Sequence, residues 1–236
     1  MLLAALCLFA TGSEPLSLDK AYGLQEGNFW QTRIQRPPAL YWEQGALVLQ
    51  GFFGASLYEN FVRSGGSGAD VDASSEEAAQ MPVIGGGGQW KLGGTGIDFG
   101  LEGLFSFAGR ANATAFAFGG SGGAIAVNID MLVFELYGGP FVSCFLGEDA
   151  RVYVGGGGLM QWVDYAQDVP GSGVEEDGSG FGTGGYVRAG IEFNVGEGLL
   201  VGFGVRWAES LVDLGPDLGE LSLDGYQFLL TVTEGF

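Results

Sequence analysis

After Trp42, apolar and polar residues alternate with a period of two, the pattern of half-buried β-strands. In 97–107 one face of the predicted strand is almost wholly apolar, whereas the other carries Asp98, Glu102 and Ser106. We find no competing stripe with the three-and-four spacing of an amphipathic helix. The pattern predicts an all-β protein with eight strands, over 45–58, 81–92, 97–118, 124–146, 150–165, 181–195, 198–208 and 222–236.

The predicted connections alternate in length. Tight turns fall at 93–96, 147–149 and 196–198, whereas long polar loops fall at 59–80, 166–180 and 209–221. Short turns at one end and long loops at the other are typical of transmembrane barrels, and a soluble β-sandwich has no reason to sort its loops in this way. We therefore expect an eight-stranded antiparallel up-and-down transmembrane β-barrel over 43–236.

The exception is Gly119–Gly123, a short connection between two unusually long strands. Segment 109–146 forms either one long hairpin or, with a turn at 128–130, an additional strand. The hairpin keeps all long loops at one end of the barrel, so we favour it. It predicts that 112–128 projects beyond the membrane as a two-stranded extension, with bends or bulges at Gly109 and at 138–140.

Residues 1–12 (MLLAALCLFATG) have the apolar run and small-residue cleavage site of a secretory signal peptide, truncated at its start because the basic leader is missing. The alternative is a buried amino-terminal strand. Residues 13–42 are predicted to be an irregular periplasmic segment. We find no later run of about 18 apolar residues, so no transmembrane helix is predicted.

The polar face of the predicted strands carries balanced charge, although the whole chain has 28 acidic and 9 basic residues and a net charge of −19. Glycine also crowds this face, as expected in a narrow lumen. Buried charges must be paired, so we predict a salt-bridge network inside the barrel; the alternative is a solvated face. The network residues are Lys91, Asp98, Glu102, Glu135, Arg151, Arg188, Glu192 and Arg206, accompanied by Gln50, Gln161 and Gln227.

Aromatic residues gather near the strand ends, where amphipathic rings favour a membrane interface. We predict two aromatic belts: Trp42, Trp90 and Phe193 at the tight-turn end, and Tyr58, Trp162, Trp207 and Tyr226 at the long-loop end.

The last strand alternates Tyr226, Phe228, Leu230 and Val232 up to a terminal Phe236, departing from strict alternation at Glu234. This resembles the carboxy-terminal assembly signal of bacterial outer-membrane proteins. Arg151–Leu159 (RVYVGGGGL) resembles a strand of the small OmpA/OmpX/OmpW-like barrels, with Arg-Val in place of the usual Arg-Pro or Lys-Pro. The resemblance implies export through the periplasm to the outer membrane, recognition by the barrel-assembly machinery, and lipid and lipopolysaccharide as surroundings.

The composition argues against catalysis. The chain has no histidine, which removes the commonest general base and metal ligand. Glu102 and Glu135 suggest an acid–base pair, but pairing with Arg188, Arg206 or Lys91 is the better interpretation. The glycine runs 85–88 and 155–158 lack the Lys-Ser/Thr and helix of a phosphate-binding loop. We expect no enzyme, no catalytic residues, no cofactor and no metal.

The predicted long loops and their borders hold fifteen of the acidic residues against one base, Arg63. Such acidity disfavours nucleic acid as a partner. No spacing resembles a calcium loop, so solvated loops are expected, and a loop carboxylate such as Glu176 should matter less for stability than Glu135 in the lumen.

Three hypotheses for function remain. The first is a non-enzymatic structural or surface-interaction barrel with a side-chain-plugged lumen. The second is a small transport barrel for ions or small apolar ligands, to which Leu104, Leu159 and Leu229 facing inward lend slight support. The third is a subunit of a larger envelope complex, docked through 13–42.

Overall fold

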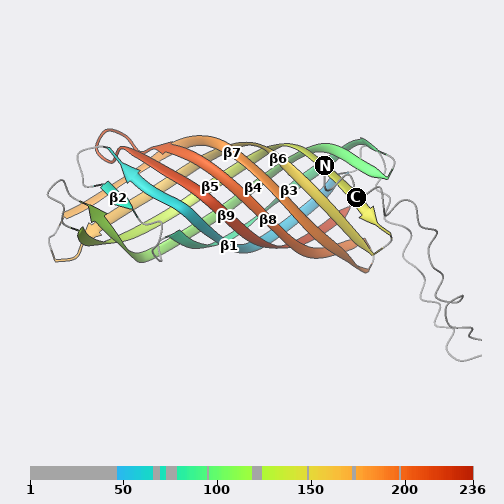
Figure 1. Cartoon of the computed structure of the whole chain (residues 1–236), viewed down its shortest axis with the longest axis horizontal. Coiled ribbons are helices and arrows are strands. Elements are labelled where there is room, and N and C mark those ends of the chain that lie inside the picture. Colours follow the sequence, from blue (N-terminus) through green and yellow to red (C-terminus); the bar gives the residue numbers. More distant parts are fainter. Residues whose placement is uncertain are drawn as a thin grey trace, which may run out of the picture.

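The computed structural model describes residues 47–65, 70–72, 79–94, 96–118, 124–147, 149–171, 174–196 and 198–235. Strands dominate this part of the chain (Figure 1). They are β1 (Leu47–Ser64), β2 (Asp70–Asp72), β3 (Gln80–Gly94), β4 (Ile97–Phe118), β5 (Ala124–Leu146), β6 (Ala150–Val169), β7 (Val174–Gly196), β8 (Leu199–Asp213) and β9 (Glu220–Gly235).

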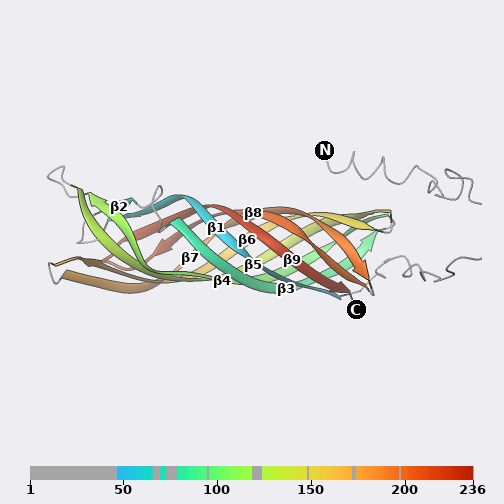
Figure 2. The same ribbon diagram turned by 90° about the horizontal axis from the view of Figure 1, so that it is seen from below.

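Eight of these strands form a closed antiparallel ring. Each long strand pairs with its neighbour along the chain, and β1 pairs with β9 from Val48 opposite Gly235 to Ser64 opposite Glu220. The strands wind obliquely around the long axis of the barrel (Figures 1 and 2). The expected eight-stranded antiparallel barrel is therefore confirmed.

The short strand β2 completes the ring where β3 is missing. β1 pairs with β3 only as far as Leu57 opposite Gln80. Beyond that point β2 pairs with β1, through Val62 opposite Asp72, and with β4, through Asp70 opposite Phe118. Part of the expected loop 59–80 is thus a wall of the barrel.

The three tight turns lie where the sequence places them, and we call this side the turn end. At the opposite side, the far end, the strands run further than predicted. β6 and β7 pair up to Val169 opposite Val174, and β8 and β9 up to Asp213 opposite Glu220. The prediction of long loops over 166–180 and 209–221 is therefore wrong, because outward residues of these strands are polar where the barrel faces water.

β4 and β5 form the single long hairpin that loop parity favoured, paired from Ile97 opposite Cys144 to Phe118 opposite Ala124. A bulge lies between Arg110 and Ala113, next to Gly109. The pairing of β5 with β6 keeps one register on both sides of 138–140, so of the bend or bulge predicted there the bulge is wrong. The hairpin is also not a free two-stranded extension, because β2 and β6 flank it.

The exterior of the barrel is apolar from the turn end to well past its middle. Phe53, Ile84 and Phe203 are between 54% and 64% exposed, while polar side chains fill the interior. This is the reverse of a soluble protein and is the arrangement of a barrel surrounded by lipid. We call this surface the apolar band.

On β1, β6 and β8 the next outward-facing residue after the apolar band is acidic. The first outward acids are Glu59 after Leu57, Asp164 after Trp162 and Glu209 after Trp207. We call the part of the barrel beyond this boundary the extension. Its outer surface faces water, since carboxylates are costly in hydrocarbon.

Most described belt residues point outward, at the edges of the apolar band: Trp90, Phe193, Trp162, Trp207 and Tyr226. Tyr58 is the exception. It is 7% exposed and points into the lumen, because it shares the parity of Gln50 on β1. Its assignment to a belt is wrong.

The predicted signal peptide (1–12), the segment 13–42, Trp42 and Phe236 lie outside the described residues. In the described part of the chain, no helix has the length and apolar character to cross a membrane.

Candidate functional site: the barrel interior

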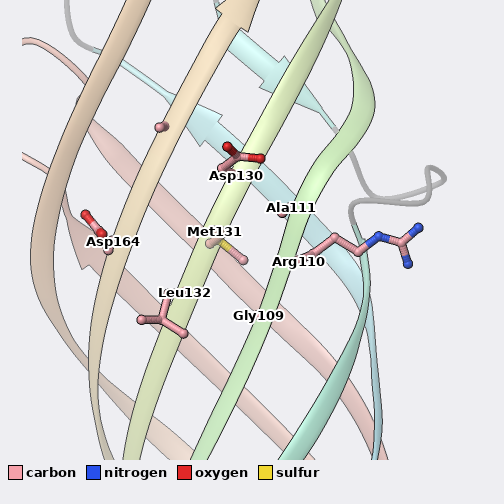
Figure 3. Close-up of a pocket in the computed structure, with 8 residues that line it drawn as sticks. Gly109, Arg110, Ala111, Asp130, Met131, Leu132 and Asp164 are labelled. Carbon is pink, nitrogen blue, oxygen red and sulfur yellow. The ribbon is translucent and has the colours of Figure 1, made fainter.

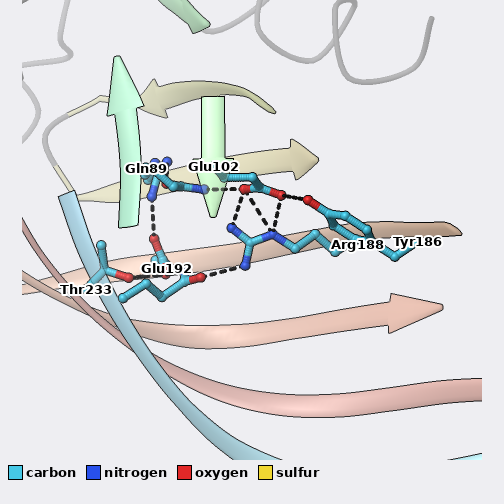
Figure 4. Close-up of polar contacts among 8 residues, drawn as sticks. Gln89, Glu102, Tyr186, Arg188, Glu192 and Thr233 are labelled. Atoms are coloured by element: carbon cyan, nitrogen blue, oxygen red, sulfur yellow. Dashed lines mark hydrogen bonds and ion pairs between the residues drawn. The ribbon is translucent and has the colours of Figure 1, made fainter. Parts of the chain in front are cut away.

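One layer of the lumen is built around Glu192 on β7. Arg151 Nη1 donates to Glu192 Oε2 at 3.0 Å, and Arg151 Nη2 donates to Gln89 Oε1 at 2.5 Å. The other carboxylate oxygen of Glu192 accepts from Gln50 Nε2 at 2.7 Å and from the Thr233 hydroxyl at 2.6 Å (Figure 4). Both oxygens of this buried carboxylate thus accept hydrogen bonds from the protein.

Glu102 on β4 is the most heavily bonded carboxylate of the network. Arg188 donates to it through Nη2, 2.6 Å from Oε2, and through Nε, 3.0 Å from Oε1. Gln89 and the Tyr186 hydroxyl each donate to it at 2.9 Å (Figure 4). Two-pronged arginine–carboxylate pairs are among the strongest hydrogen-bonded contacts in proteins, so Glu102 ties β4 to β3 and β7 across the lumen.

Glu135 on β5 belongs to a looser arrangement. Its carboxylate accepts from Ser106 at 2.5 Å and from Gln161 and Gln227 at 3.1 Å each. Arg206 Nη2 is 4.0 Å from Glu135 Oε2, too far for a direct hydrogen bond. The Arg206 guanidinium instead donates to Gln227 and lies 3.8 Å from the centre of the Tyr137 ring.

Near the turn end, Lys91 Nζ is 2.8 Å from Asp98 Oδ1. The structure therefore brings the eight predicted charges together as four pairs, Lys91–Asp98, Arg151–Glu192, Arg188–Glu102 and Arg206–Glu135, each less than one-tenth exposed. Sequence reasoning missed Gln89 and Thr233, and it placed Ser106 on the polar face without including it in the network; all three hydrogen-bond to members of these pairs. Gln89 carried a usable signal, because it has the same strand parity as Lys91.

Gly155 on β6 makes the close approach of Glu102 to the wall possible. A Cβ atom at Gly155 would lie 2.2 Å from Glu102 Oε1, whereas one at Gly158, which faces outward, would meet nothing within 4 Å. Gly155 is therefore required for close packing in the lumen.

We expect Gly155→Ala to lower the free energy of unfolding by about 1–3 kcal/mol, because the methyl group forces Glu102 out of its pairing with Arg188. Gly158→Ala is the matched control on the same strand and should change it by about 0.5 kcal/mol or less. Denaturant titration of both variants in lipid vesicles measures the difference. Equal effects would contradict the close-packing role of Gly155.

Inside the extension the chemistry of the lumen changes from polar to apolar. The side chains there belong to a buried apolar cluster that includes Phe61, Ile129, Val163, Val212 and Leu221, each 1% exposed or less. The reason is the surroundings: beyond the apolar band water lies outside the wall, so the apolar residues pack inside as in a soluble barrel.

A set of four hydrogen-bonded or ion-paired residues, Arg63, Glu176, Gln167 and Tyr165, lies within this apolar region. Arg63 Nη1 donates to the Leu218 carbonyl at 2.8 Å, and Arg63 Nη2 is 3.8 Å from Glu176 Oε2. Gln167 donates to Glu176 at 2.6 Å and accepts from Tyr165 at 2.9 Å. Arg63 and Glu176 therefore do not sit in solvated loops as the sequence suggested. They lie on β1 and β7, and Arg63 holds the β8–β9 turn through the Leu218 carbonyl.

Tyr165 is the titratable group of the extension with the clearest perturbation. Burial raises the pKa of Tyr165 from 10.0 to about 12, although the nearby Arg63 guanidinium opposes the shift. Tyr165 therefore stays protonated and keeps donating to Gln167 far above neutral pH.

The outer surface has a hollow beside the bulge of β4. It has a volume of about 460 Å³, and its lining includes Gly109, Arg110, Asp130, Leu132 and Asp164 (Figure 3). Arg110 donates to the Gln80 carbonyl at 3.0 Å. Among the described residues, no group of three or more His, Cys, Asp and Glu side chains is arranged to hold a metal ion.

The sequence matches no family model, and no curated protein matches it. Solved structures similar to the chain include the outer membrane protein OprG of Pseudomonas aeruginosa, at 13% identity, with 84% of this chain and 98% of that chain covered and a TM-score of 0.48. They also include Ail of Yersinia pestis, at 13% identity, 82% and 100% coverage and a TM-score of 0.44. Neisserial surface protein A matches at 13% identity, 81% and 97% coverage and a TM-score of 0.40.

The TM-scores are all below 0.5, so the class of the protein rests on its own strand pairing. Eight antiparallel strands close into a ring, with apolar side chains outside and paired charges inside. This is the architecture of an outer-membrane type of transmembrane β-barrel.

Proposed function

We propose that the protein is a non-enzymatic β-barrel of the bacterial outer membrane with a structural or surface-interaction role. The observation that carries the proposal is the double filling of the lumen: paired charges fill it at the level of the apolar band, and apolar side chains fill it in the extension. A filled interior leaves the outer surface and the connections at the far end as the parts that can meet other molecules.

The charge of the extension supports a surface role. In a bacterial outer membrane the carboxy-terminal strand ends at the periplasmic side, so the extension would stand outside the cell. Its outward acids include Glu59, Asp130, Asp164, Asp168, Glu175, Asp177, Glu209, Asp213 and Glu220, on strand exteriors rather than in long loops. A surface of this sign favours cationic partners and disfavours nucleic acid.

The network also supports the absence of enzymatic activity. The carboxylates of Glu102 and Glu135 each accept hydrogen bonds from three side chains of the protein. A general acid or base needs a hydrogen-bond path to a reacting group, and these two are committed to neighbours.

Conductance in planar lipid bilayers tests the proposal. We expect the unmodified protein to give no steady current steps, because eight strands leave an interior that side chains can fill. A wide-channel porin in the same bilayer serves as the positive control. Steady, reproducible conductance steps would contradict the plugged lumen and favour the transport hypothesis.

Transport of a small apolar ligand is the second candidate. The observation that favours it is the buried apolar cluster, which reaches from the extension to Leu104, Leu159 and Leu229 at the level of the apolar band, each 4% exposed or less. Saturable uptake of an apolar probe into vesicles that carry the barrel, without ion conductance, would favour this function.

Docking to an envelope partner through 13–42 stays a prediction, and a pull-down with that segment as bait tests it.

A further inference from the structure

Four buried polar groups in the middle of the lumen make no hydrogen bond to any described residue. They are Ser56 Oγ, the hydroxyls of Tyr58 and Tyr137, and Arg206 Nη1. The four residues are between 0% and 7% exposed, so bulk solvent does not hydrogen-bond to these groups. Buried polar groups are nearly always hydrogen-bonded, to protein or to ordered water.

These four groups surround one charge pair, Glu135 and Arg206. The Tyr58 hydroxyl lies close to Ser56 and Gln227, and the Tyr137 hydroxyl lies close to Glu135 and Ser106, in each case without hydrogen-bond geometry. Arg206 stacks on the Tyr137 ring at 3.8 Å. Residues from β1, β4, β5, β8 and β9 thus direct their polar atoms at one small region.

Glu135 and Arg206 lie too far apart for a direct hydrogen bond, and Arg206 Nη1 has no acceptor among the described residues. Glu135 takes its direct hydrogen bonds from Ser106, Gln161 and Gln227. Arg206 is 4.0 Å away from it and uses Nε and Nη2 on Gln227 and Ser106. Arg206 Nη1 and the hydroxyls of Ser56, Tyr58 and Tyr137 therefore have no hydrogen-bond partner in the part of the chain that the structure describes. They lie beside the oppositely charged Glu135 carboxylate and Arg206 guanidinium.

We propose that this region binds ordered water, which bridges Glu135 to Arg206 and hydrogen-bonds the two tyrosines. A buried water typically makes about three hydrogen bonds to groups that lack another partner. A neutral ligand fits better than an anion, because the Glu135 carboxylate lies against the same donors. The inference does not depend on the proposed surface role, since it concerns the interior alone.

The neighbouring pair provides the contrast. Arg188 contacts Glu102 directly at 2.6 Å, and the Tyr186 hydroxyl donates to the same carboxylate at 2.9 Å. Tyr137 and Tyr186 are equally buried, and their ring centres are 5.0 Å apart. The lumen therefore holds a directly bonded layer and a hydrated layer side by side.

Hydroxyl-radical footprinting of the full chain in lipid nanodiscs tests the site, because radicals generated from bound water oxidise the side chains that touch it. We expect Tyr58 and Tyr137 to be modified several-fold faster than Tyr186, which is the matched internal control. Modification of Tyr58 and Tyr137 at the same slow rate as Tyr186 would overturn the proposal.

Two further measurements test whether water fills this region. Tyr137→Phe should slow the modification of Tyr58 and should not raise the unfolding midpoint. If the Tyr137 hydroxyl were an unmet donor in a dry interior, removing it would raise the midpoint, and this would overturn the proposal. Replacing chloride by sulfate at equal ionic strength should shift the midpoints of the unmodified protein and of Tyr137→Phe equally, because sulfate stabilises folded proteins in general. A chloride dependence confined to the unmodified protein would assign the site to an anion instead of water.

Discussion

Replacing Glu102 by leucine is expected to lower the free energy of unfolding by about 3–5 kcal/mol, because a buried guanidinium then loses its carboxylate. Arg188 would keep its bond to Gln50, but Gln89 and Tyr186 would also lose an acceptor. Denaturant titration of the barrel in lipid vesicles, followed by tryptophan fluorescence, measures the change.

The control is a carboxylate on the outside of the extension. Glu175→Leu should alter the free energy of unfolding by no more than about 1 kcal/mol, since Glu175 is exposed. Glu176, which the sequence presented as a solvated loop residue, is unsuitable because it lies near Arg63 and accepts from Gln167. The double variant Glu102→Leu/Arg188→Leu should cost less than the sum of the single variants. Simple additivity would contradict the pairing.

Leu221→Ala is expected to destabilise the extension by about 2–5 kcal/mol, because it opens a cavity in a packed apolar core. Leu221 is fully buried on β9 and belongs to the apolar cluster of the extension. The effect should be local: amide exchange should rise in the extension, while the strands of the apolar band keep their protection.

Leu211→Ala is the matched control for this experiment. Leu211 is the neighbour in sequence of Val212, which lies opposite Leu221, but it faces outward and is 50% exposed. Its truncation should change the free energy of unfolding by about 0.5 kcal/mol or less. An equal effect of the two substitutions would mean that the interior of the extension is not a packed core.

The alternation of side chains determined much of the fold. It placed the tight turns and the single β4–β5 hairpin, and it put the eight charges on one face. The belt assignment of Tyr58 is wrong because it rests on the position of the residue near a strand end, whereas the alternation, with Gln50 on the same strand, assigns it to the lumen. The sequence does not indicate where the strands end, since β6 and β7 continue to Val169 and Val174 through residues with the composition of a polar loop.

By itself, the sequence determined the period of two, the balance of charge on one face and hence a barrel with a polar interior, because these depend only on which residues alternate. Tertiary structure alone decided which charges pair, as with Glu102 and Arg188, which are 86 residues apart. It also decided where the lumen turns apolar. The stagger of the strands around the ring sets both, because it brings distant positions to one height and fixes which of them face lipid and which face water.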